Sequence, residues 1–193
     1  MMLSLKLKNR LLAQGIRSIS LNNRLLIETD ELQTLIKEEP EKLTIFNATY
    51  SIGGVIPREE HIKSRIPTSI YYDFNDFSHK DKKFSYTVPS EEEFREQMKK
   101  IGVRKSDIVV VYDKIGMISA PRAFWLFKTF GLENVYLLNG VFNKWQAEGR
   151  PLESGDSEGA WKKLRSTVPA PGDFNFHFEK RKIEYYSHIR HIA

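Results

Sequence analysis

Four side chains that could do chemistry follow the most apolar run of the chain. The run from Ile108 to Tyr112 is continuously hydrophobic, as expected for a central strand that is covered on both faces. Ligands of parallel α/β sheets bind beyond the carboxyl ends of the strands, so the segment after this run is the first candidate site. That segment holds a carboxylate, two cations and a hydroxyl: Asp113, Lys114, Ser119 and Arg122.

Two of these residues could be nucleophiles, and the pattern argues against both. An aspartate that accepts a phosphoryl group commonly has a second acid two residues later, but position 115 is isoleucine. A serine nucleophile needs an activating histidine, and none is placed for Ser119. We therefore expect Asp113 to accept hydrogen bonds from the loop amides and Ser119 to cap the following helix. Lys114 and Arg122 beside this helix make the group a candidate small-anion site, and no residue is assigned a catalytic role.

The histidines and glycines do not indicate a metal or a cofactor. His188 and His191 are three residues apart, but a metal site needs a third ligand, and none is placed. Gly53 and Gly54 form a turn without the lysine that a phosphate-binding loop requires. We expect no metal, no cofactor and no small-molecule substrate.

The elements that position the candidate site alternate regularly between strand and helix. Such alternation is typical of an α/β fold with an open, mostly parallel sheet and helices on both faces, spanning residues 28–152. A capping-box pair, Ser90 and Glu93, precedes one helix, and Gly102 ends it. Strands are expected at 43–46, 70–72, 108–112 and 135–138, and helices at 59–64, 91–101, 119–130 and 142–147, with a further helix that Thr29 caps.

Composition excludes several kinds of protein. The 193 residues contain no cysteine, so disulfides, thiolate metal sites and thiol chemistry are excluded within this sequence. Forty per cent of the residues are hydrophobic, which is too many for a disordered chain. No window approaches the ~18–20 apolar residues of a membrane-spanning helix.

The positive charge lies at the two ends of the chain. Residues 1–27 hold five bases and no acid, and residues 161–193 hold seven bases and three acids, which leaves 18 bases and 22 acids in residues 28–160. Residues 1–27 are also amphipathic at helical spacing, which is typical of a mitochondrial targeting segment; a solvated tail or a partner-binding helix is the alternative. Residues 153–193 are predicted to be a linker, over 153–159, and a basic, aromatic extension in which phenylalanines alternate at 174, 176 and 178.

The motifs together resemble the N-terminal domain of the tandem rhodaneses, the thiosulfate and 3-mercaptopyruvate sulfurtransferases. The resemblance extends over about residues 25–155 and rests on Val109 to Asp113, Ser119 to Arg122, Leu137 to Gly140, Trp145 and Glu148 to Pro151. It implies the rhodanese fold. It also implies altered local geometry at Thr68 and Val141, where the family usually has glycine.

The resemblance also implies a chemistry that this sequence lacks. The family uses a cysteine thiolate at the end of the central strand, in the second domain of the tandem proteins, and the equivalent position of this domain is Asp113. We therefore expect a catalytically inactive domain that serves as a structural or accessory subunit of a large mitochondrial assembly, such as a respiratory-chain or ATP synthase complex. Its expected partners are protein subunits that contact both tails, with a membrane surface as a further contact.

Two alternative functions remain open from the sequence. Basic extensions on an acidic domain also suit an RNA-contacting accessory protein of a mitochondrial ribosome. The group around Asp113 also suits a regulatory module that binds a small anion.

Overall fold

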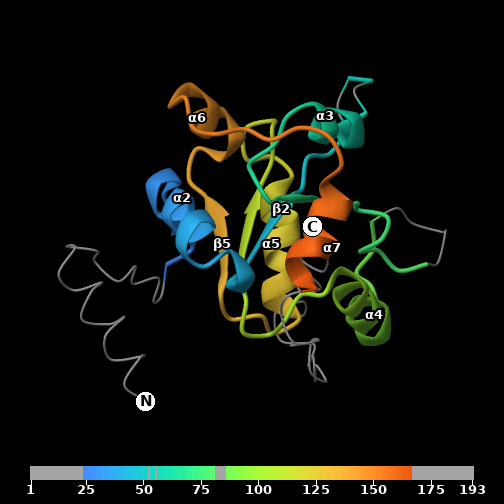
Figure 1. Cartoon of the computed structure of the whole chain (residues 1–193). Helices are drawn as coiled ribbons and strands as arrows, with labels where there is room; N and C mark the ends of the chain where they lie inside the picture. Colours follow the sequence, from blue (N-terminus) through green and yellow to red (C-terminus); the bar gives the residue numbers. More distant parts are fainter. Residues whose placement is uncertain (1–23, 52, 55, 81–85, 167–193) are drawn as a thin grey trace, which may run out of the picture.

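The computed structural model describes residues 24–51, 53–54, 56–80 and 86–166, which form one parallel sheet between two layers of helices (Figure 1). The strand order is β1-β5-β4-β2-β3, and every neighbouring pair is parallel. The expected α/β fold with an open parallel sheet is therefore confirmed. The strands are β1 (Leu26–Ile27), β2 (Leu43–Asn47), β3 (Ile70–Tyr71), β4 (Ile108–Tyr112) and β5 (Val135–Leu138).

Helices cover both faces of the sheet because the central strand is apolar on both sides. Val109 and Val111 of β4 pack into one hydrophobic cluster, and Val110 and Tyr112 pack into the other. The first cluster includes side chains of α4, α5 and α7, and the second includes side chains of α2 and α6. These helices are α2 (Thr29–Glu38), α4 (Glu91–Ile101), α5 (Ala120–Thr129), α6 (Val141–Ala147) and α7 (Ser157–Arg165); α3 (Pro57–Lys63) and the 3-10 turn η1 (Pro40–Lys42) complete the described elements. Within the described ranges, no helix has the length and apolar character to cross a bilayer.

The local signals around α4 are confirmed. Ser90 Oγ accepts a hydrogen bond from the Glu93 amide at 3.2 Å, and the Glu93 carboxylate accepts one from the Ser90 amide at 2.7 Å. Gly102 follows the helix with φ of 83°, the left-handed backbone that glycine adopts without a steric cost.

Two predictions at the start of the domain are wrong. Thr29 is the first residue of α2 and not its cap, because its hydroxyl donates to Glu148 at 2.6 Å and the preceding residue, Glu28, is in the capping position. Leu26 and Ile27 belong to strand β1 and not to a basic extension over 1–27, because they pair with Leu137 and Leu138. A two-residue strand whose partner lies so far along the chain has no local sequence signal.

The predicted linker over 153–159 is also wrong. Glu153 forms an antiparallel bridge with Arg65, with a 2.9 Å hydrogen bond in each direction. Asp156 then caps α7 by accepting from the amides of Glu158 and Gly159. The described domain therefore continues through α7. The phenylalanines at 174–178, the two C-terminal histidines and residues 1–23 of the basic extension lie outside the described residues.

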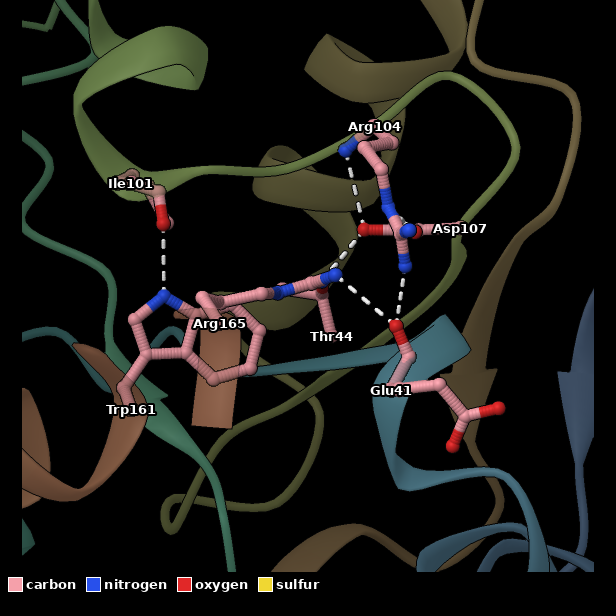
Figure 2. Close-up of polar contacts among 7 residues, drawn as sticks. All are labelled: Glu41, Thr44, Ile101, Arg104, Asp107, Trp161 and Arg165. Atoms are coloured by element: carbon pink, nitrogen blue, oxygen red, sulfur yellow. Dashed lines mark hydrogen bonds and ion pairs between the residues drawn. The ribbon is translucent and has the colours of Figure 1, made fainter. Parts of the chain in front are cut away.

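A buried polar network holds α7 against the sheet (Figure 2). The indole of Trp161 donates to the carbonyl of Ile101 at 2.7 Å, and the guanidinium of Arg165 lies 4.4 Å from the Trp161 ring. Arg165 also forms an ion pair with Asp107 at 2.5 Å, and Asp107 pairs in turn with Arg104 at 3.0 Å. Burial lowers the pKa of Arg165 and Asp107 opposes that shift, so the charge is held in place by its buried partner.

Thr68 and Val141, the two positions where a family glycine is missing, both have a left-handed backbone. Their φ angles are 64° and 48°, in a region that costs a branched side chain about 1–2 kcal/mol. The expectation of altered local geometry is not confirmed, because both residues adopt the left-handed backbone that a glycine allows, at the cost of this strain. Val141 is buried, so its packing offsets part of this cost, whereas Thr68 is only half-buried.

We predict that Thr68→Gly stabilises the domain by about 0.5–1 kcal/mol, because relief of the strained backbone exceeds the added entropy of the unfolded glycine. Urea unfolding measures this change. The matched control is Thr34→Gly within α2, where φ is already helical and the same replacement should cost about 1 kcal/mol. If both variants were less stable than the unmodified chain, the proposed backbone strain at Thr68 would be wrong.

Candidate functional site

Asp113 lies at the carboxyl end of β4 with its side chain fully buried. One carboxylate oxygen accepts from the amides of Ile115 at 3.1 Å and Met117 at 2.8 Å. The other accepts from the amides of Ser119 and Ala120, both at 2.9 Å. The expectation that Asp113 binds the loop amides is confirmed, and its carboxylate fills the space between these amides and the start of α5.

Ser119 occupies the N-cap position of α5, as predicted, but its hydroxyl makes no capping hydrogen bond. Its hydroxyl donates to the carbonyl of Ala48 at 2.6 Å and accepts from the amide of Tyr50 at 3.2 Å. Asp113 supplies the acceptor for the first amides of the helix in its place. Ser119 therefore joins the loop after β2 to the loop after β4, and this role leaves its hydroxyl engaged.

Lys114 and Arg122 point away from the amides that Asp113 binds. The ammonium of Lys114 donates to the carbonyls of Glu60 at 3.0 Å and Ser64 at 3.1 Å, beneath α3. Burial lowers the pKa of Lys114. The guanidinium of Arg122 donates to the carbonyl of Tyr86. The four candidate residues lie close together in the sequence, but the side chains of Lys114 and Arg122 do not point toward a common anion-binding position.

A hollow beside this loop was not predicted from the sequence. Its volume is about 470 Å³ and its walls are largely aromatic. The hydroxyls of Tyr50 and Tyr86 are hydrogen-bonded to each other at 3.2 Å, which raises the pKa of Tyr86. These walls come from separate loops, so no single stretch of sequence signals the hollow. It is lined by Tyr50, Phe74, Tyr86, Ile118, Ser119 and Arg122.

The hollow is lined by apolar and aromatic side chains and one cation, and not by a set of catalytic groups. Ile118 is 64% exposed, although it is a large apolar residue. Arg122 contributes the positive charge of the wall, and the Ser119 hydroxyl is already engaged by Ala48 and Tyr50. The lining therefore suits contact with an apolar group beside an anion and supplies no activated nucleophile.

His61 of α3 is a second feature that sequence reasoning missed. Its side chain is 1% exposed, and its Nδ1 lies 3.0 Å from the amide nitrogen of Asn47. The Asn47 carbonyl oxygen accepts from the amide of Thr49, so the Asn47 amide nitrogen donates to His61. This geometry assigns the imidazole proton to Nε2. Burial, with the cations Arg65 and Lys114 nearby, lowers the pKa of His61 to about 3.

We predict that His61 makes stability fall on acidification. Because its pKa is below that of an unfolded histidine, only the unfolded chain takes up the proton between about pH 6.5 and pH 3. The free energy of unfolding should fall by about 1.4 kcal/mol for each pH unit across this window. Urea unfolding between these pH values measures the slope, and His61→Gln should reduce it by that amount. An unchanged slope in the variant would exclude His61 as the cause.

Known proteins share sequence similarity with the part of the chain that contains this site. A family model described as a rhodanese-like domain matches residues 28–148. A probable 3-mercaptopyruvate sulfurtransferase of Schizosaccharomyces pombe is 32% identical over 123 residues, which are 63% of this chain and 41% of the relative. The chain thus spans less than half the length of this curated relative.

Solved structures of sulfurtransferases also superimpose on this chain. The 3-mercaptopyruvate sulfotransferase SseA of Escherichia coli superimposes with a TM-score of 0.67 at 28% identity, over 81% of this chain and 56% of that chain. The sub-stoichiometric sulfur transferase subunit of yeast mitochondrial complex I superimposes with a TM-score of 0.62 at 27% identity, over 79% of this chain and 49% of that chain.

Proposed function

The chain belongs to the rhodanese-like domain family, and from this membership we propose that it is a catalytically inactive member that serves as an accessory subunit of a large mitochondrial assembly. A respiratory-chain or ATP synthase complex is the assembly that the proposal favours. The relatives are named as sulfurtransferases, so the proposal departs from them in catalysis and not in fold.

The observation that carries the proposal is the buried carboxylate of Asp113. Four backbone amides and the start of α5 surround this carboxylate, at the end of the central strand where the fold presents its anion-binding loop. Both oxygens are occupied by these donors, so neither is available to attack a substrate. The 193 residues also lack the cysteine on which thiol-based sulfur transfer depends.

The accessory role is supported by one relative in particular. The yeast protein that matches at 27% identity is a subunit of mitochondrial complex I, and its similarity extends over most of this chain. Mitochondrial location is supported by the same relative and by the basic, acid-free composition of residues 1–27.

Density-gradient separation of solubilised mitochondria tests the assembly. The tagged protein should co-migrate with a large complex and remain there after nuclease treatment. Migration as a free 22.5 kDa species would refute the accessory role. Release by nuclease would instead identify an RNA-contacting protein of a mitochondrial ribosome.

A thiosulfate:cyanide sulfurtransferase assay on the purified chain tests the loss of catalysis. We expect no turnover above the protein-free rate. Asp113→Cys should also be inactive, because one sulfur atom cannot accept the four hydrogen bonds that two carboxylate oxygens accept. Turnover by the unmodified chain would refute the proposal.

A further inference from the structure

Exposed lysines gather at the edge of the sheet where the strands begin. The strands are parallel and α2, α4 and α5 run back between them, so the last turns of these helices lie at the amino ends of the strands (Figure 1). Helix α7 ends there too, because Arg165 bonds Thr44 at the start of β2 and Asp107 just before β4. The exposed lysines of this amino-end edge are Lys37, Lys99, Lys100, Lys105, Lys162 and Lys163.

Few acids balance these lysines. Asp107 is buried between Arg104 and Arg165, and Glu39 pairs with Lys42, so both are already engaged. None of the six lysines forms an ion pair with another residue in the described part of the chain. The acids near them are Glu38, Glu41, Glu96 and Glu133, of which Glu96 lies one turn before Lys99 and Lys100 on α4. Acids gather at the opposite edge, where the first turns of α2, α3, α4 and α7 carry Asp30, Glu31, Glu59, Glu60, Glu91, Glu92, Glu93 and Glu158. Unlike the six lysines, five of these acids pair with basic residues: Glu31, Glu60, Glu92, Glu93 and Glu158.

Helix stability explains part of this arrangement but not all of it. Bases in the last turn and acids in the first turn both favour a helix dipole. That effect does not account for Lys105, which lies in the turn before β4. It also does not account for where the basic N-terminal flank attaches, since the chain enters β1 from this side at Arg24. Residues 1–23 contain four bases and no acid.

We propose that this amino-end edge docks on an anionic lipid bilayer. Protein interfaces are centred on aromatic and arginine anchors and are depleted in lysine, whereas six exposed lysines lie at this edge, beside the exposed Glu38, Ser106, Glu133, Asn134 and Ser166. Lysines near a negatively charged leaflet contribute to binding additively without a specific pocket. The leucines and bases of residues 1–23 alternate as in segments that lie in a membrane interface. The inference adds a membrane-facing surface to the proposed accessory role and does not depend on which complex is the partner.

Vesicle sedimentation with the full chain tests the proposal. Vesicles of phosphatidylcholine and phosphatidylglycerol should bind the protein, and vesicles of phosphatidylcholine alone should not. Binding should weaken steeply as salt shortens the screening length to about 3 Å at 1 M. Two charge-reversal variants then locate the face. Lys99→Glu with Lys163→Glu changes the amino-end edge, and Lys63→Glu with Lys80→Glu changes the opposite edge; each lowers the formal net charge from +5 to +1.

The two variants have the same net charge, so only the position of the charge separates them. A lysine at an anionic surface contributes a factor of about five, and the amino-end variant should therefore bind at least about 25-fold more weakly. The opposite-edge variant should lose much less binding. Each variant replaces a base in the last turn of a helix, so both should unfold at a somewhat lower urea concentration than the unmodified chain and remain folded in the vesicle assay. Equal losses in the two variants, or no binding to anionic vesicles, would overturn the proposal. Either result together with co-migration in the gradient would leave the accessory role standing.

Discussion

Asp113→Ala is expected to lower the free energy of unfolding by about 3–5 kcal/mol, among the largest effects of any single replacement in this domain. The replacement removes the acceptor of four amides, of which those of Ser119 and Ala120 are buried and those of Ile115 and Met117 are partly buried. Each buried donor without a partner costs about 1–3 kcal/mol, and some of this cost is recovered as the loop relaxes or admits water. Urea unfolding followed by circular dichroism measures the change.

Asp156→Ala is the matched control for Asp113→Ala. Asp156 also accepts from two amides, those of Glu158 and Gly159, but it is exposed, so water replaces it and the cost should be about 1 kcal/mol. Similar losses in the two variants would show that the burial of Asp113 has no special effect. Sulfate should partly restore the stability of Asp113→Ala and leave Asp156→Ala unchanged, because only the first variant opens a buried set of amides that an anion can occupy.

Asp107→Ala is expected to lower the free energy of unfolding by about 3–5 kcal/mol, and to loosen the packing of α7 against the sheet. Asp107 lies at the edge of the sheet opposite Asp113. Asp107 is 2% exposed and receives ion pairs from both Arg104 and Arg165. Without it, two guanidinium groups in the interior have no carboxylate between them (Figure 2). Amide hydrogen exchange should show faster exchange throughout α7, where Trp161 and Arg165 hold the helix in place.

Arg165→Met provides the contrast for Asp107→Ala. It removes one cation but leaves Asp107 paired with Arg104, and methionine retains part of the apolar contact with Trp161. The loss should therefore be about 1–2 kcal/mol. If Arg165→Met destabilises the domain as much as Asp107→Ala, packing by the arginine stem and not the shared carboxylate holds α7.

Signals between neighbouring residues predicted the structure well. The strands of the sheet interior, the Ser90 and Glu93 capping pair and the end of α4 at Gly102 all depend on residues within a few positions of each other. The amide contacts of Asp113 are equally local, since its farthest donor is seven residues away. The missing family glycines marked two positions with a left-handed backbone, Thr68 and Val141, but no such signal marked Tyr86 and Met117, which also have a positive φ.

Contacts between distant residues could not be predicted in this way. Strand β1 depends on β5, more than one hundred residues later, and α7 depends on the buried carboxylate of Asp107. The polar segment 153–159 has the composition of a linker, and only its pairing with Arg65 and the burial of Trp161 make it part of the domain. Lys114 and Arg122 share a loop with Asp113, but their side chains are directed by carbonyls of other loops.

The sequence by itself determined the alternation of the elements, the absence of a thiol and the position of Asp113 at the end of the central strand, because each of these is a property of residue type and local spacing. Only the tertiary structure decided that Lys114 and Arg122 turn away from the Asp113 loop and that α7 closes the domain. It also decided that the exposed lysines meet at one edge of the sheet. These features depend on side chains that folding brings together from distant positions, where burial and charge, rather than propensity, set the energy.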